Sequence, residues 1–336
     1  MNLIEISNLD VIYKLPTTSV KALSGISLSL EEGDFFGLIG ESGCGKTTVA
    51  KAITKLLPSN GEITNGSILF KGKDISKMTE GEFRHLRWKE ISIVPQSAMN
   101  SLDPVYNLGT QMVEAISSHK RINKREAWKR AEEMFQLVNI NPERLKDYPH
   151  QFSGGMKQRA IIGMSLILNP SLIIADEPTT GLDVIVQDQI FIQFTRLLKE
   201  LKKTLFLITH DVSIVVENCD RVAVMYGGKI VEYGNVKDVF KIPFHPYTMG
   251  LQNAFPSTNI TDKALISIPG YPPDLTNPPR GCPFSMRCPF SDQLCEEKMP
   301  AFVEVGIRHF SLCHYVENAD KFRILVKDQN TWLQKE

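Results

Sequence analysis

The sequence has no excess of either charge. Lys and Arg together number 38, as do Asp and Glu, so the formal net charge at pH 7 is zero and the isoelectric point is near neutral. Such a balance provides no long-range attraction for nucleic acid or for acidic lipid. Nucleic acid is therefore not an expected partner.

Long hydrophobic runs are also missing. The longest, residues 160–168, is interrupted by Gly163 and Ser165 and is far shorter than the ~18 apolar residues that a membrane span needs. The first residues, MNLIE, lack the basic region and apolar core of a signal peptide. We therefore expect a soluble cytoplasmic protein that reaches a membrane only through a partner.

Cysteine is scarce over most of the chain and concentrated near its end. Of six cysteines, one lies at position 44 and one at 219, and the other four follow the spacing C-x₅-C-x₆-C-x₁₇-C: Cys282, Cys288, Cys295 and Cys313. In a reducing compartment such a cluster favours metal binding over disulfides. Four thiolates bind zinc or an iron–sulfur cluster, and the absence of C-x₂-C pairs favours [4Fe–4S], with zinc as the alternative. Unligated buried thiols are the third interpretation.

Patterns of hydrophobicity divide the chain into segments. Residues 3–7, 26–30, 35–39, 67–70 and 91–94 are predicted strands, and 46–57 a helix. From about 108 to 145, apolar residues recur at helical spacing, which predicts a helical insertion. After residue 154 the alternation returns, with strands predicted at 172–175 and 205–208 around a long helix, and a hairpin at 221–226 and 229–233. Strands that are apolar on both faces indicate a parallel sheet covered by helices.

The composition changes again beyond residue 240, where prolines precede the cysteine cluster. The predicted organisation is a nucleotide-binding domain over residues 1–240, with a helical subdomain inserted at about 98–157, and a C-terminal module over 241–336.

A phosphate loop is the clearest chemical motif. Residues 40–47, GESGCGKT, fit G-x₄-G-K-[ST] between a predicted strand and a predicted helix. Its glycines allow backbone N–H groups to surround phosphate oxygens, Lys46 reaches the β- and γ-phosphates, and the Thr47 hydroxyl binds Mg²⁺. The residues predicted to hold ATP here are Gly40, Ser42, Gly43, Gly45, Lys46, Thr47 and Thr48.

Polar residues follow three other predicted strands. Asp176 ends one and is placed to bind Mg²⁺, and Glu177 beside it is the predicted base that polarises the attacking water. Gln96 can touch both Mg²⁺ and this water, because its amide donates and accepts hydrogen bonds. His210, after the strand predicted at 205–208, is expected to bond the γ-phosphate as a neutral imidazole. The bland alternative for each is a solvated polar residue at the end of a strand.

A second glycine-rich turn, Ser153-Gly154-Gly155, precedes the acidic strand end. Together with the phosphate loop, Gln96, Asp176-Glu177-Pro178, Gly181-Leu182-Asp183 and His210, it resembles the ATP-binding subunits of ABC transporters over most of the chain. Met156 departs from the pattern, since many members of the family have Gln at that position.

This resemblance implies a P-loop NTPase (RecA-like) α/β core with an antiparallel β subdomain, the inserted helical subdomain and a small Cys-rich C-terminal module. It also implies that two such domains close head to tail on two ATP molecules. Ser153, Gly154 and Gly155 would then contact the γ-phosphate held by a partner, and Asp183 would lie at that interface. Tyr13 matches the position that stacks on adenine, with a core tyrosine as the alternative.

The C-terminal motifs narrow the resemblance. Residues 244–248, FHPYT, residues 281–284, GCPF, and residues 287–289, RCP, resemble the oligopeptide/dipeptide importer branch. Such subunits power the uptake of peptides, or sometimes nickel or other small solutes. They work with two membrane permeases, an external solute-binding protein and a second, related ATP-binding subunit, which makes a heterodimer the expectation. Some carry a [4Fe–4S] cluster. The implied location is peripheral, on the cytoplasmic face of the cell membrane.

Two other classes of ABC protein serve as alternatives. A soluble ABC ATPase of DNA repair or translation usually has a coiled-coil insertion or two nucleotide domains in one chain, and neither is visible in this sequence. Exporters often fuse a membrane domain to the ATPase, so export is disfavoured.

Overall fold

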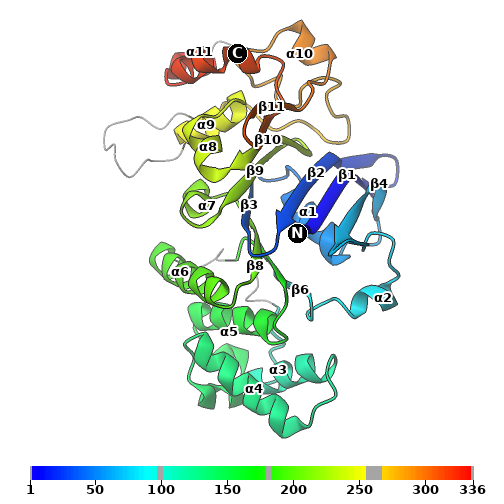
Figure 1. The fold of residues 1–336 in the computed structure, drawn as a ribbon, viewed down its shortest axis with the longest axis vertical. Helices are drawn as coiled ribbons and strands as arrows, with labels where there is room; N and C mark the ends of the chain where they lie inside the picture. Colours follow the sequence, from blue (N-terminus) through cyan, green and yellow to red (C-terminus); the bar gives the residue numbers. More distant parts are fainter. Residues whose placement is uncertain (1, 97–100, 179–182, 255–266, 334–336) are drawn as a thin grey trace. The chain divides into compact units, whose positions relative to one another are not determined.

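The computed structural model describes residues 2–96, 101–178, 183–254 and 267–333 (Figure 1). Contacts group the chain into two compact units. Unit 1 comprises Glu31–Asp34 and Lys77–Ile208, and unit 2 comprises Asn2–Leu30, Phe35–Ser76 and Thr209–Glu336. Unit 1 lies entirely before position 240, whereas unit 2 contains residues from both sides of it. The domain boundary expected at residue 240 stays a prediction.

An antiparallel sheet forms the N-terminal part of unit 2. Its order is β2 (Ser19–Glu31), β1 (Asn2–Lys14), β4 (Gly61–Phe70) and β5 (Lys73–Asp74). The first three of these strands are labelled in Figure 1. β1 is much longer than the strand predicted at 3–7. Its register with β4 shifts between Ser7 and Asp10, which marks a bulge just after the predicted end. Asn8 has a positive φ of 48° at this bulge. A bulge interrupts the alternation of apolar and polar residues from which a strand is predicted, so the predicted strand ends at the bulge although β1 continues.

A second sheet in unit 2 joins the nucleotide motif to the C-terminal residues. β3 (Phe35–Ile39) runs parallel to β9 (Arg221–Tyr226), which pairs antiparallel with β10 (Lys229–Asn235). The predicted hairpin is confirmed, and both of its turn glycines, Gly227 and Gly228, have positive φ. β10 then pairs with β12 (His309–Ser311), and β12 with β11 (Val303–Gly306). The C-terminal residues therefore extend a sheet of unit 2.

Unit 2 also contains helices, which precede or follow these strands in the sequence. α1 (Lys46–Thr54) follows β3 and ends before the predicted residue 57, because Lys55 adopts a left-handed φ of 53°. The others are α7 (Val212–Asn218), α8 (Val236–Lys241), α9 (Pro246–Ala254), α10 (Gln293–Glu297), the 3₁₀ turn η4 (Val316–Asn318), α11 (Ala319–Leu325) and α12 (Gln329–Leu333).

One carboxylate anchors the C-terminal residues to β10. Glu232 has an exposed fraction of 0% and accepts hydrogen bonds from the backbone N–H groups of Phe244 and His245 at 2.8 and 2.9 Å. It also bonds His309 Nε2 at 2.8 Å. These three bonds satisfy a carboxylate that burial would otherwise make costly.

Unit 1 contains a parallel sheet. Its order is β8 (Thr204–Thr209), β7 (Leu172–Asp176) and β6 (Ile91–Val94), with Leu172 opposite both Ile91 and Thr204. Every residue of β7 and β8 is buried, which agrees with the continuous apolar runs of the sequence. The predicted parallel strands are confirmed.

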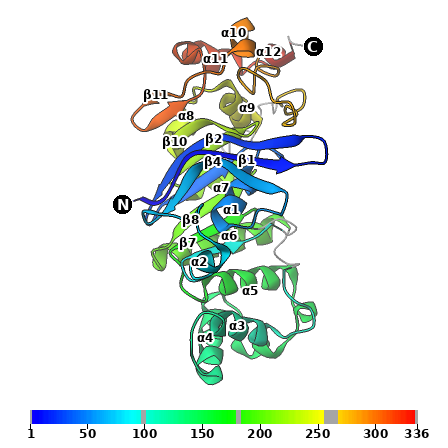
Figure 2. The ribbon, with the colours of Figure 1, turned by 90° about the vertical axis from the view of Figure 1, so that its right-hand side faces the viewer.

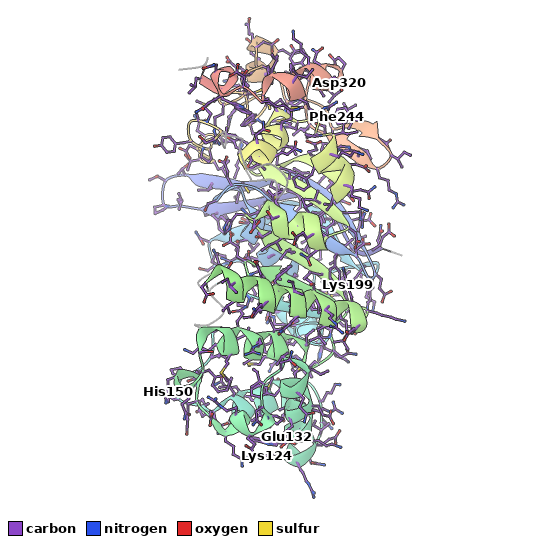
Figure 3. All side chains as sticks on the ribbon, turned by 90° about the vertical axis from the view of Figure 1, so that its left-hand side faces the viewer. Lys124, Glu132, His150, Lys199, Phe244 and Asp320 are labelled. Carbon is purple, nitrogen blue, oxygen red and sulfur yellow. The ribbon has the colours of Figure 1, made fainter. Side chains whose placement is uncertain are left out.

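The helical segment of unit 1 includes α3 (Leu108–Ser117), α4 (Lys124–Leu137) and α5 (Gly154–Leu166), which lie together in Figure 2. Asn107 and Asn123 cap α3 and α4 by accepting backbone N–H bonds. Charged residues such as Lys124 and Glu132 lie on α4 (Figure 3), and Ala127 and Ala131 are among its buried residues. The remaining elements are α2 (Glu80–Arg84), the 3₁₀ turns η2 (Pro142–Lys146) and η3 (Pro149–Gln151), and α6 (Val184–Glu200).

In the described ranges, no helix combines the length and the apolar character needed to cross a membrane.

Candidate nucleotide site and cysteine cavity

The phosphate loop lies in unit 2, between β3 and α1. Two of its glycines are required by close backbone contacts. A Cβ at Gly40 would lie 2.2 Å from the carbonyl oxygen of Met225, and one at Gly45 would lie 2.6 Å from that of Ala22. Both glycines also have positive φ, as does Gly43. The loop therefore has a tight backbone with glycines where a side chain would collide, as phosphate binding by backbone N–H groups needs.

Lys46 is folded over the start of this loop. Its Nζ donates to the carbonyl oxygens of Gly40 at 2.7 Å and Glu41 at 3.0 Å, and the residue is only 6% exposed. Ser42 and Gly43 are exposed, and Thr47 is half-buried in the first turn of α1. The ammonium group is thus held at the loop, with exposed loop backbone beside it.

Tyr13 is connected to the same helix. Its hydroxyl group lies 3.1 Å from the hydroxyl oxygen of Thr48, so β1 and α1 are tied together by this hydrogen bond. The side chain is half-buried. Its stacking on adenine stays a prediction.

In unit 1, Gln96 and Glu177 are brought together. The Gln96 Nε2 donates to the Glu177 Oε2 at 2.9 Å. Asp176 is the last residue of β7 and is 3% exposed, while Glu177 has a positive φ of 47° and donates its N–H to the Ile208 carbonyl at 2.8 Å. The left-handed turn directs the chain away from the strand immediately after Asp176, so the two adjacent carboxylates occupy different environments.

The Ser-Gly-Gly turn and Asp183 line one surface pocket of unit 1. Ser153 caps α5 by accepting from the Met156 N–H at 3.3 Å, and Asp183 caps α6 by accepting from the Val186 N–H at 3.1 Å. Two helix N-termini therefore open on the same pocket, and such ends attract anions. Gly181 and Leu182, named with Asp183 in the sequence motif, lie outside the described residues.

His210 belongs to unit 2, where it is exposed between β8 and α7. The next residue, Asp211, caps α7 by accepting from the N–H groups of Ser213 and Ile214. The predicted site residues are therefore divided between the two units. The phosphate loop, Tyr13 and His210 lie in unit 2, and the strand-end carboxylates, Gln96 and the Ser-Gly-Gly turn lie in unit 1.

The sequence motifs gave no separate role to Gln158. Gln158 on α5 is 2% exposed, and its side-chain amide donates to the carbonyl oxygen of Pro178. Pro178 directly follows Glu177, so this bond connects the helix that starts at the Ser-Gly-Gly turn with the acidic strand end. A buried Gln within a helix carries no local sequence pattern that would reveal its hydrogen-bond partner.

All four C-terminal cysteines line one small cavity in unit 2, together with apolar residues such as Phe284, Phe290 and Phe322. Burial raises the pKa of Cys282 to about 11 and that of Cys313 to about 12, and it raises the pKa of Cys288 further still. Free thiols at these positions would be protonated at neutral pH, since burial disfavours the thiolate.

The four cysteines share the lining of this cavity with other polar residues such as His245, Ser285 and Tyr315. Within the parts of the chain that the structure describes, no three His, Cys, Asp or Glu side chains are arranged to hold one metal ion. Neither the iron–sulfur cluster nor the zinc alternative expected from the sequence is shown by the described residues.

Two family models match successive parts of the chain. A family model described as "ABC transporter" matches residues 23–180, and one described as "Oligopeptide/dipeptide transporter, C-terminal region" matches residues 231–295. The chain is 41% identical to the dipeptide transport ATP-binding protein DppD of Caldanaerobacter subterraneus subsp. tengcongensis, over 94% of this chain and 97% of that protein. It is 42% identical to the oligopeptide transport ATP-binding protein OppD of Escherichia coli (strain K12), over 89% of each.

The fold is also similar to solved structures. The ATP-binding cassette MJ0796, in a dimeric post-hydrolysis state bound to ADP and Pi, matches 69% of this chain and 98% of its own with a TM-score of 0.62 and 26% identity. CbiO1 from Clostridium perfringens, part of the ABC transporter complex cbiONQ, covers 71% of this chain with a TM-score of 0.59 and 29% identity.

Proposed function

This chain belongs to the ABC transporter ATP-binding proteins of the oligopeptide/dipeptide family, and we propose that it hydrolyses ATP to drive the import of peptides through partner membrane permeases. One observation carries the proposal: the chain matches peptide-transport ATP-binding proteins at about 40% identity over nearly their whole length, including the C-terminal region that distinguishes this branch. The same chain also matches the ABC transporter family model, over residues 23–180.

The ATP site is proposed to be completed by two chains. Lys46 and the backbone of the phosphate loop hold the phosphates of one ATP, Tyr13 stacks on its adenine, and Thr47, Gln96 and Asp176 bind its Mg²⁺. Glu177 polarises the attacking water, and His210 bonds the γ-phosphate. The hydrogen bond between Gln96 and Glu177 supports a common task for these two side chains.

The Ser-Gly-Gly turn is proposed to act on the ATP of a second ATP-binding subunit. The pocket shared by Ser153, Gly154, Gly155 and Asp183 supports this role, because two helix N-termini there provide N–H groups and partial positive charge for phosphate oxygens. ATP bound between two subunits would favour the closed pair by contacts that hydrolysis removes. Closing and reopening would drive the permeases between outward-facing and inward-facing states.

The proposed function requires several partner proteins. Two permeases, a second and related ATP-binding subunit, and an external solute-binding protein that delivers the peptide are the proposed partners. The chain would then lie at the cytoplasmic face of the membrane as a peripheral subunit.

A [4Fe–4S] cluster bound by Cys282, Cys288, Cys295 and Cys313 is part of the proposal. The single cavity that these four residues line supports it, since a four-iron cluster spaces its thiolate ligands more widely than one metal ion does. When bound, the cluster would give the C-terminal residues a rigid, cross-linked core. The four thiols would bind the cluster as thiolates.

Reconstitution of the transporter in proteoliposomes tests the function. With the permeases and binding protein present, we expect ATP hydrolysis that increases when a peptide is added, and peptide accumulation that requires ATP. Lys46→Ala should abolish both, because it removes the ammonium group that binds the β- and γ-phosphates. ATP-driven uptake of nickel without any uptake of peptide would overturn the proposed substrate class.

A further inference from the structure

Glu41 is the second residue of the phosphate loop, and all three of its polar groups are bonded. Its carbonyl oxygen accepts from Lys46 Nζ at 3.0 Å, its N–H donates to the Tyr247 hydroxyl at 2.9 Å, and its Oε2 accepts from Arg287 Nη1 at 2.7 Å. Two of these partners belong to the C-terminal region, and the loop motif does not require either of them. The start of the phosphate loop is therefore held from outside by both its backbone and its side chain.

Arg287 is itself firmly fixed. Its side chain is 6% exposed, and its Nε and Nη2 donate to the carbonyl oxygens of Pro269 at 2.8 Å and Ile268 at 3.1 Å. Nη1 also donates to the Tyr226 hydroxyl at 3.1 Å, and the guanidinium lies 5.6 Å from the centroid of the Tyr226 ring. A guanidinium stays charged when buried, and a buried charge without a paired opposite charge is costly. The carboxylate of Glu41 therefore stabilises the buried guanidinium of Arg287.

Aromatic rings connect this ion pair with the cysteine cavity. Tyr226 and Tyr247 pack at 4.6 Å between ring centroids, and Phe284 lies 5.1 and 5.4 Å from them. Phe284 also lines the cysteine cavity, and its carbonyl oxygen accepts from the N–H groups of Arg287 and Cys288 at 3.0 and 2.9 Å. The segment 282–288 thus lies in continuous contact from the cavity to the phosphate loop.

We propose that Arg287 is a positioning residue for nucleotide binding, and that it acts through Glu41. This inference rests on the proposed ATPase function. Two effects follow from the geometry. Arg287 neutralises a carboxylate that would otherwise repel the triphosphate, and it fixes the first turn of a glycine-rich loop that would otherwise lose conformational entropy on binding. Through Arg287, the C-terminal region sets the affinity of the phosphate loop for MgATP.

The test measures MgATP binding to the full-length chain by calorimetry. Arg287→Gln should weaken binding about 10-fold, which corresponds to about 1.4 kcal/mol. Combining it with Glu41→Gln should restore the affinity to within about threefold of the wild type, because the unpaired negative charge is gone. In the assembled transporter, the Arg287→Gln substitution should raise KM for ATP while kcat changes less than about twofold.

Arg323→Gln is the matched control. Arg323 also belongs to the C-terminal part of unit 2, where its guanidinium lies 5.3 Å from the ring centroid of Phe244 and its Nη1 donates to the Pro243 carbonyl at 2.7 Å. It pairs with Asp320. Phe244 and Asp320 are labelled in Figure 3. The control should bind MgATP like the wild type, since its ion pair involves no residue of the phosphate loop.

Arg287→Lys provides a second variant in case the glutamine variant fails to fold. Lysine retains the charge opposite Glu41 but lacks the guanidinium that bonds Pro269 and Ile268, so MgATP affinity should lie between that of the wild type and a 10-fold loss. A 10-fold loss in the lysine variant, or wild-type affinity in a folded glutamine variant, would overturn the inference alone. If the wild-type chain bound no MgATP, the proposed function would fail and this inference with it.

Discussion

Gln96 and Glu177 are 81 positions apart in the chain, yet their side chains meet in a hydrogen bond of 2.9 Å. They follow the neighbouring parallel strands β6 and β7, whose carboxyl ends lie at one edge of the sheet. The helices α3, α4 and α5 all lie between these two residues in the sequence. A movement of the helical segment that shifts Gln96 would therefore change the position of the proposed base.

Glu177→Gln should separate ATP binding from hydrolysis. Glutamine keeps an oxygen that can accept from Gln96, so the geometry is preserved while the ability to polarise water is lost. We expect kcat for ATP hydrolysis to fall by about 10²–10⁴-fold, with MgATP affinity within about threefold of the wild type. Steady-state turnover and equilibrium nucleotide binding measure these two quantities.

Glu200→Gln is the control for this variant. Glu200 ends α6 in the same unit and accepts from Arg196 at 2.9 Å, but both side chains are largely exposed. Its loss should leave hydrolysis unchanged, because exposed ion pairs contribute little. Equal turnover by Glu177→Gln and the wild type would remove Glu177 from its proposed role as base.

The sequence predicted β3 and β6 to the residue, because each is a short apolar run with clear boundaries. It missed most of β1, where a bulge breaks the alternation, and it extended α1 past Lys55, whose left-handed conformation has no sequence signal as clear as glycine. Local patterns therefore located the elements better than their ends.

Motifs named the candidate residues but could not supply their partners. The pairing of Gln96 with Glu177 depends on the order of two strands, and that of Arg287 with Glu41 joins residues 246 positions apart. Neither partner is encoded in the local spacing of residues. Likewise, C-x₅-C-x₆-C-x₁₇-C placed four thiols together without showing that they would surround a cavity.

Iron analysis tests the proposed cluster. Protein purified without oxygen should be brown and contain about four iron and four sulfide ions per chain. Cys288→Ser should lower the iron content, since serine replaces one of the four thiolate ligands. Cys219→Ser should not, because Cys219 follows α7 and is not among the residues that line the cavity. A colourless wild-type protein with one zinc ion per chain would reject the cluster.

Ser153→Ala should reduce ATP turnover beyond what the loss of a helix cap explains. Ser153 caps α5, and Asn123 caps α4 in the same manner by accepting from the Glu126 N–H at 2.9 Å. Each alanine variant should lose about 1 kcal/mol of stability. Only Ser153→Ala should lower turnover in the assembled transporter, by about 10-fold if one phosphate hydrogen bond is lost. Equal turnover in the two variants would limit Ser153 to capping.

The buried carboxylate of Glu232 should matter far more for stability than an exposed ion pair of the same unit. Glu232→Ala leaves the N–H groups of Phe244 and His245, together with His309, without their acceptor, so unfolding in urea should require about 3–5 kcal/mol less free energy. Glu62→Ala is the control: Glu62 bonds Lys14 at 2.6 Å, but the two side chains are 51% and 63% exposed. Its loss should cost less than about 1 kcal/mol. Similar urea midpoints for the two variants would mean that Glu232 does not anchor the C-terminal residues to β10.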